Sequence, residues 1–184
     1  NQWYNKHPSK KNSRKRYFRI ENCFHHVSNM IVTNCLKYGI GTIIIGKNDG
    51  WKQRLNMRKK EKQTFQYIPF NKLFEKLGYK ALIAGISVIF TEEAYTSKAS
   101  FFDNDPLPRY ERGVEPPEFS GTRKHRGLYV TNSGFAVNAD VNASLNIGRK
   151  VIPEFLKRIG DRSLAARPVV VSSLSKLTSE KLAS

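Results

Sequence analysis

The sequence predicts a mixed α/β domain in which two short apolar strands lie side by side in a sheet. Segments with a helical period, at 18–38 and 69–84, alternate with β-branched runs at 41–46 and 86–93. The chain has 184 residues, of which 39% are hydrophobic. This is enough for one domain with a hydrophobic core and too few for two domains of typical size. Ligands gather beyond the carboxyl ends of strands in such sheets, so functional residues are expected there.

The first helix is predicted from apolar residues that recur every three or four positions up to Tyr38, with Gly39 as its end. The run GTIIIG at 41–46 then predicts a buried strand, and the KNDG that follows predicts a turn. In that turn, Asp49 is expected to form the turn and not to bind a metal.

The two cysteines, Cys23 and Cys35, both fall on this helix. Twelve residues at about 1.5 Å each put them roughly 18 Å apart, which excludes a disulfide within the helix. With two cysteines in the whole chain, a four-thiolate zinc site is excluded as well.

The second half begins with a helix whose first turn holds Pro69, followed by a strand, ISVIFTEE, that ends on Glu92 and Glu93. Four prolines and no periodicity predict an irregular connection over 101–125. A hairpin follows within 127–137, and a helix runs from Asp140 to about 156. We expect a weakly ordered tail over 157–184 and a basic lead-in over 1–17.

The formal net charge of +17 and the pI near 10.0 predict a polyanionic partner, and nucleic acid is the first candidate. No window approaches 18 uncharged apolar residues, so we expect no membrane span, and the start has no signal-peptide pattern. The expected setting is cytoplasmic, with no small-molecule substrate.

The segment 51–63 is rich in Lys and Arg, with aromatic and amide side chains between them. By composition it is a solvated loop or a surface that grips phosphates while rings stack on bases, and we favour nucleic-acid contact. The candidate nucleic-acid-binding residues are Lys52, Gln53, Arg54, Arg58, Lys59, Lys60, Lys98, Arg123, Lys124 and Arg126.

Two carboxylates stand out because the chain has 15 acidic against 32 basic residues. Glu93 ends an apolar strand, although by itself it could be a surface ion-pair partner of a lysine. Asp140 begins a helix and could simply cap it, but Asn138, Asn142 and Asn146 accompany it and favour a site. Carboxylates of this kind bind Mg²⁺ in phosphodiester hydrolysis.

Alternation along a strand sends Glu92 and Glu93 to opposite faces, so only one of them can join Asp140. We expect Glu93 to do so, and a second hypothesis treats both Glu93 and Asp140 as structural parts of a non-catalytic basic binding module.

Several strings in this order resemble the TnpB (OrfB) family of proteins encoded by bacterial insertion sequences. They are IGKN with WKQ within 45–53, EEAYTSKASF at 92–101, and NADVN with NI within 138–147. The resemblance implies the C-terminal, RuvC-like part of an RNA-guided DNA endonuclease, with an RNase-H-like fold over 18–156, and DNA and guide RNA as partners. It also implies Mg²⁺, with Mn²⁺ as a substitute, bound by three acidic residues.

Asp140 matches the last of the three acidic residues. The middle one commonly ends the strand that corresponds to 42–46, where this chain has Gly46 and Lys47. In the branch of the family with the IGKN and WKQ strings, the carboxylate is relocated to the position of Glu93. The resemblance thus implies that Glu93 and Asp140 are catalytic metal ligands.

Two departures limit the resemblance. The family usually has a zinc ribbon of two Cys-x-x-Cys pairs between TSK and the final Asp, but no cysteine follows Cys35, so the insertion at 101–137 is expected to be a degenerate, zinc-free ribbon. The first-strand Asp has no counterpart either. The chain is therefore expected to be a fragment or a degenerate transposon remnant, incomplete at its N-terminus and inactive alone.

Overall fold

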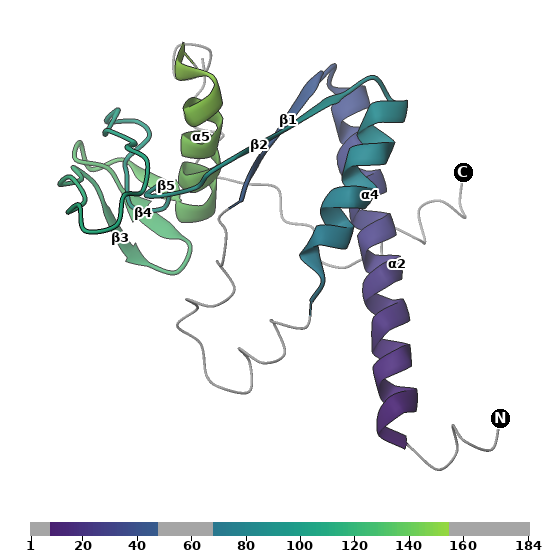
Figure 1. Ribbon diagram of the computed structural model, residues 1–184. Coiled ribbons are helices and arrows are strands. Elements are labelled where there is room, and N and C mark those ends of the chain that lie inside the picture. The colour runs from purple at the N-terminus through teal and green to yellow at the C-terminus, as the bar shows by residue number, and fades with distance from the viewer. Residues whose placement is uncertain (1–7, 48–67, 155–184) are drawn as a thin grey trace. The chain divides into compact units, whose positions relative to one another are not determined.

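The computed structural model describes residues 8–47 and 68–154, and the predicted loop at 51–63, the turn with Asp49 and the tail at 157–184 lie outside these residues. The chain divides into two compact units. The described part of the first unit is 8–43 and 68–88, and that of the second is 44–47 and 89–154. We describe each unit by itself (Figure 1).

The first unit is built on two helices, α2 (Pro8–Lys37) and α4 (Phe70–Ile83), which pack along each other (Figure 1). Their apolar residues meet between them, with the rings of Phe24 and Phe70 6.3 Å apart and with Leu77 and Ala81 buried. Both predicted helices are confirmed. However, α2 begins ten residues before the predicted start at 18, because Pro8 suits a first turn and the following lysines and arginines favour helix.

Polar contacts fasten α4 to α2. Lys80 Nζ donates hydrogen bonds to the carbonyl oxygen of His25 (2.9 Å) and to Ser28 Oγ (2.7 Å). Burial lowers the pKa of Lys80, and the neighbouring Lys76 lowers it further. Lys76 in turn lies 2.5 Å from a carboxylate oxygen of Glu21. The lysines of α4 therefore serve the packing of the helix pair.

The two predicted strands form a two-stranded sheet of β1 (Thr42–Gly46) and β2 (Ser87–Thr91). The amide of Ser87 donates to the carbonyl of Gly41 (2.9 Å), and that of Lys47 to the carbonyl of Thr91 (2.8 Å). These two bonds show that the strands are parallel, since residue numbers rise in both strands from the first bond to the second. The expectation of a fully buried first strand is wrong, since β1 is at best half-buried along its length.

The second unit contains a three-stranded antiparallel sheet in the order β3 (Thr122–His125), β4 (Leu128–Val130), β5 (Ala136–Asn138). The predicted hairpin is confirmed, with Tyr129 opposite Val137 in the β4–β5 ladder. Helix α5 (Ala139–Val151) follows directly and ends five residues before the predicted end. Pro153 explains the early end, because proline disfavours helical backbone in the residue before it.

The core of this unit is a small cluster of Tyr129, Val137 and Ala139, each at most 1% exposed, against which Phe102 and Phe135 pack. The Tyr129 hydroxyl donates to the carbonyl of Lys98 (2.8 Å), and burial raises the pKa of Tyr129 to about 12. The sheet and the helix thus share one apolar centre.

Two carboxylates, Asp103 and Asp105, tie together the segment in which the resemblance places a ribbon. Asp105 accepts hydrogen bonds from the amides of Ser100 (2.7 Å) and Ser120 (3.1 Å) and from Ser120 Oγ (2.7 Å). Asp103 accepts from Ser100 Oγ (2.5 Å) and from the amide of Asn132 (2.8 Å). These bonds join three stretches of the segment, around residues 100–105, 120 and 132.

Candidate nucleic-acid and metal site

Asp140 lies in the first turn of α5 but does not cap the helix. The cap is Asn138, whose side-chain oxygen accepts hydrogen bonds from the amides of Asp140 (2.9 Å) and Val141 (3.1 Å). The capping alternative for Asp140 is therefore wrong. Its carboxylate is left exposed at the positive end of the helix dipole, where a negative charge is favourable.

The other two asparagines of α5 hold a loop in place. Asn142 accepts from the amide of Phe101 (3.0 Å) and donates to the carbonyl of Ala99 (2.9 Å). Asn146 donates to the carbonyls of Thr96 (2.9 Å) and Ala99 (2.7 Å). Both side chains are fully buried. These two amides satisfy the backbone of the TSK loop (96–101), so Asn142 and Asn146 are not themselves evidence for a site at Asp140.

Glu92 and Glu93 make different contacts. Glu92 Oε1 lies 2.5 Å from Lys150 Nζ on α5, and the two side chains form an ion pair. Glu93 lies beside the end of β1: a Cβ added to Gly46 would come within 3.0 Å of both the Cβ and Oε2 of Glu93. The same added atom would meet the Cδ1 of Ile147 at 2.7 Å.

The Glu93 carboxylate therefore fills the space that a side chain at position 46 would need. This space lies between the last residue of β1 and the middle of α5. Burial raises the pKa of Glu93, since its charged form loses water there. A divalent cation would favour the charged form, so the environment of this carboxyl suits a metal ligand.

Asp140 and Ile147 are seven residues apart on α5, which places them on the same face and roughly 10 Å apart along its axis. Glu93 adjoins the Ile147 end of that interval. Within residues 8–47 and 68–154, no three His, Cys, Asp or Glu side chains gather to hold a metal.

A basic surface adjoins Asp140. Arg123 on β3 reaches it, with Arg123 Nη2 3.6 Å from Asp140 Oδ1. Arg123 and Lys98 also line one pocket of about 530 Å³, together with Glu118. Lys124 and Arg126 are exposed nearby on β3 and the turn after it. The remaining six candidate nucleic-acid-binding residues lie outside the described residues: Lys52, Gln53, Arg54, Arg58, Lys59 and Lys60.

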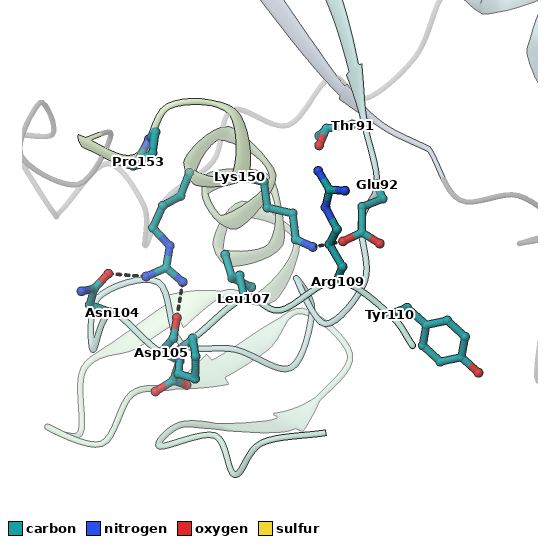
Figure 2. Close-up of a pocket in the computed structure, with 11 residues that line it drawn as sticks. Thr91, Glu92, Asn104, Asp105, Leu107, Arg109, Tyr110, Lys150 and Pro153 are labelled. Carbon is teal, nitrogen blue, oxygen red and sulfur yellow. Dashed lines mark hydrogen bonds and ion pairs between the residues drawn. The ribbon is translucent and has the colours of Figure 1, made fainter. Parts of the chain in front are cut away.

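A second pocket, of about 780 Å³, lies at the end of β2 (Figure 2). Glu92 lines one side, Lys150 and Arg149 line another, and Arg109 and Tyr110 come from the proline-rich loop. The sequence analysis did not identify this pocket. The loop appeared there only as an irregular connection, and no spacing rule pairs Glu92 with a lysine 58 residues later.

These features define a mixed α/β protein with a basic surface beside two carboxylates. Parts of the chain resemble known proteins. Residues 70–147 match the sequence model of the Cas12f1-like TNB domain family. Among solved structures, the chain resembles one in the "Cryo-EM structure of the Cas12f1-sgRNA-target DNA complex", with a TM-score of 0.52 and 17% sequence identity. The match covers 79% of this chain and 38% of that one. The search of curated proteins gives no match.

Residues 70–147 thus correspond to a Cas12f1-like TNB domain, and the resemblance to TnpB-like proteins recognised in the sequence is confirmed. The chain spans less than half the length of the solved chain that it matches. Among its described helices, none is long and apolar enough to cross a membrane.

Proposed function

We propose that this chain forms the C-terminal, RuvC-like part of a transposon-encoded RNA-guided DNA endonuclease, with an RNase-H-like fold. The match to the TNB family and the fold shared with Cas12f1 support this proposal. So does the parallel β1–α4–β2 arrangement, which delivers Glu93 just beyond a strand end, where α/β sheets bind ligands. DNA and guide RNA are the proposed partners, and the cytoplasm is the proposed setting.

The observation that carries the proposal is the position of Glu93 beside Gly46. The resemblance implies that related proteins commonly have a glutamate at the end of the strand corresponding to β1. In this chain, that position is glycine, and Glu93 Oε2 lies 3.0 Å from where the missing Cβ would be. A carboxylate from the end of β2 therefore takes the place of one from the end of β1.

Glu93 and Asp140 would hold Mg²⁺, with a third carboxylate corresponding to the first-strand Asp of the family. Glu93 adjoins Ile147, which lies two turns after Asp140 on the same face of α5, so both carboxylates lie along one face of this helix. When bound, the metal would polarise the phosphodiester and lower the pKa of the attacking water.

This chain's own residues would orient the substrate. Arg123 pairs with Asp140 at 3.6 Å and is 40% exposed, so it can also contact a phosphate. Lys98 lines the same pocket and adds a second positive charge. Asn142 and Asn146 fix the TSK loop that carries Lys98, which keeps this charge in place.

Moving the carboxylate from position 93 to position 46, a swap of glutamate and glycine, tests the role of Glu93. We expect Glu93→Gly to weaken Mn²⁺ binding at least about tenfold, measured from the electron paramagnetic resonance signal of free Mn²⁺. The double variant Gly46→Glu with Glu93→Gly should recover much of the affinity, because a carboxylate returns to the same space.

The matched control is Gly46→Glu alone, in which two glutamates compete for one space, since the new Cβ comes within 3.0 Å of the Cβ and Oε2 of Glu93. This variant should lose thermal stability relative to the double variant. A double variant that binds Mn²⁺ no better than Glu93→Gly would refute the proposed replacement.

Nucleic-acid binding is expected to depend strongly on salt. If about six phosphates are contacted, affinity for DNA or RNA should fall on the order of 10³-fold between 50 and 200 mM salt, measured by fluorescence anisotropy. With two of the three implied carboxylates, the purified chain should bind without Mg²⁺-dependent cleavage. Affinity that is independent of salt would contradict the prediction of electrostatic binding. Robust Mg²⁺-dependent cleavage would contradict the prediction that this chain binds without cleaving.

The second candidate function is a non-catalytic nucleic-acid-binding module. One observation favours it: Asp140 is 84% exposed and already has a cationic partner in Arg123. In that case Mn²⁺ affinity would be unaffected by substitution of either Glu93 or Asp140, while salt-sensitive binding would remain. The swap experiment therefore separates the two candidates.

A further inference from the structure

We propose that the pocket at the end of β2 binds a phosphate of a single-stranded nucleic acid, with Arg109 as its main ligand. This inference rests on the proposed function and adds a second contact beside the candidate metal site. The pocket has a volume of about 780 Å³ and opens next to Glu92, the residue before Glu93.

The charges around the pocket leave one cation available. Arg149 is buried and donates to neutral acceptors, the side-chain oxygens of Asn104 and Asn146 and the carbonyl of Asp105. Lys150 donates to Glu92 and to the carbonyl of Pro108. Arg109 is exposed and, within the described residues, has no hydrogen-bond or ion-pair partner.

The negative charges do not cancel this set. Asp105 directs its carboxylate at the amides of Ser100 and Ser120, and it faces the pocket through its carbonyl, which accepts from Arg149. Glu92 pairs with Lys150, and the Asp105 carboxylate also attracts Arg149 electrostatically. Three cations, Arg109, Arg149 and Lys150, against the two carboxylates Glu92 and Asp105 leave an excess of one positive charge, which an anion would neutralise.

The loop that carries Arg109 is stiffened before any ligand arrives. Pro106 and Pro108 lie on either side of Leu107, and Pro106 and Leu107 line the pocket. Fixed proline backbone lowers the entropy lost when Arg109 is held by a ligand. Figure 2 shows the Arg109 side chain pointing along the end of β2 toward Thr91.

The chemistry of these groups selects a phosphate. A guanidinium presents paired donors that match two phosphate oxygens, and a nearby ammonium adds a point charge. Tyr110 lines the pocket beside Arg109 with 52% of its surface exposed, so a base next to the bound phosphate would lie near it. A single strand offers both groups together, because its bases are not paired.

The test measures binding of a single-stranded thymidine oligomer to the full chain as a function of salt. Each lost phosphate contact should lower the slope of log affinity against log salt by about 0.7. We expect Arg109→Ala to show this decrease. Arg112→Ala is the matched control, since it removes the same charge from the same loop at an exposed residue outside the pocket.

Glu92→Gln provides an opposite change in the same pocket. It removes the negative charge that holds Lys150, so we expect tighter binding of the oligomer and a steeper salt dependence. Circular dichroism would confirm that each variant is folded. Inorganic phosphate added as a competitor should weaken binding of the unaltered chain more than that of Arg109→Ala.

Equal slopes for Arg109→Ala and Arg112→Ala would overturn the pocket while leaving nucleic-acid binding intact. Failure of the unaltered chain to bind any oligomer would instead overturn the proposed function itself. Tighter binding by Glu92→Gln supports the pocket, and weaker binding by this folded variant counts against it.

Discussion

Replacing Glu93 by glutamine is expected to weaken Mn²⁺ binding at least about tenfold, because the amide keeps the shape of the side chain and removes its charge. Glu92→Gln is the matched control, since it removes the same charge one residue earlier, from the pair with Lys150. Binding measured by loss of the free Mn²⁺ resonance signal should separate the two variants. An equal loss in both would assign the effect to general charge and not to a ligand.

The same experiment has a defined dependence on pH. Burial raises the pKa of Glu93 above the usual value of 4.5, so protons compete with the metal for this carboxyl over a wider range. Mn²⁺ affinity should rise as pH increases through the raised pKa and then level off.

In the absence of metal, the raised pKa of Glu93 makes the free energy of unfolding decrease as pH rises through this range. The folded chain holds the proton of Glu93 at pH values where the unfolded chain has lost it. The Mn²⁺-induced rise in melting temperature should therefore be larger at pH 7 than at pH 5. In Glu93→Gln, the Mn²⁺-induced rise in melting temperature should lose the part of its pH dependence that comes from Glu93.

Replacing Asp105 by alanine is expected to destabilise the second unit by about 2–3 kcal/mol. The substitution leaves the buried amide of Ser100 without its acceptor, at about 1–3 kcal/mol, while Ser120 is exposed, so its amide and hydroxyl can bond to water at a smaller cost. At about 2–4 °C for each kcal/mol, the melting temperature should fall by roughly 5–10 °C. Differential scanning calorimetry of the full chain measures it.

Glu115→Ala is the control for this prediction, since it removes a carboxylate from an exposed position in the same segment. Its effect should stay within about 0.5 kcal/mol. Added zinc or a chelator should change neither melting temperature, because the carboxylate contacts join the segment without cysteine. A small effect of Asp105→Ala would show that the apolar cluster around Tyr129 holds the segment without these bonds.

Much of the backbone followed from local pattern. The helical period gave α4 to within one residue at each end, and β-branched runs next to glycines gave both strands of the parallel pair. The start of α2 was missed because its first two turns are basic and polar and carry no apolar period. Such a stretch is helical through the intrinsic preference of its residues, which a search for apolar periodicity does not detect.

The site was less accessible to the sequence. The strings around Glu93 and Asp140 made them candidates, but three asparagines at helical spacing look the same whether they bind an ion or a loop. Only the fold brings Ala99 and Thr96 to Asn146 and shows that the amides are already used. Amide side chains carry no signature of their partner, so burial and contact had to decide.

By itself, the sequence determined that this is a basic, TnpB-like α/β chain with few carboxylates, since charge, periodicity and motif strings are properties of the residue order. The tertiary structure alone decided which carboxylate goes where. Glu92 meets Lys150, and Glu93 fills the space beside Gly46. These adjacent residues have different environments because the surroundings of a side chain depend on residues tens of positions away, which only folding brings near.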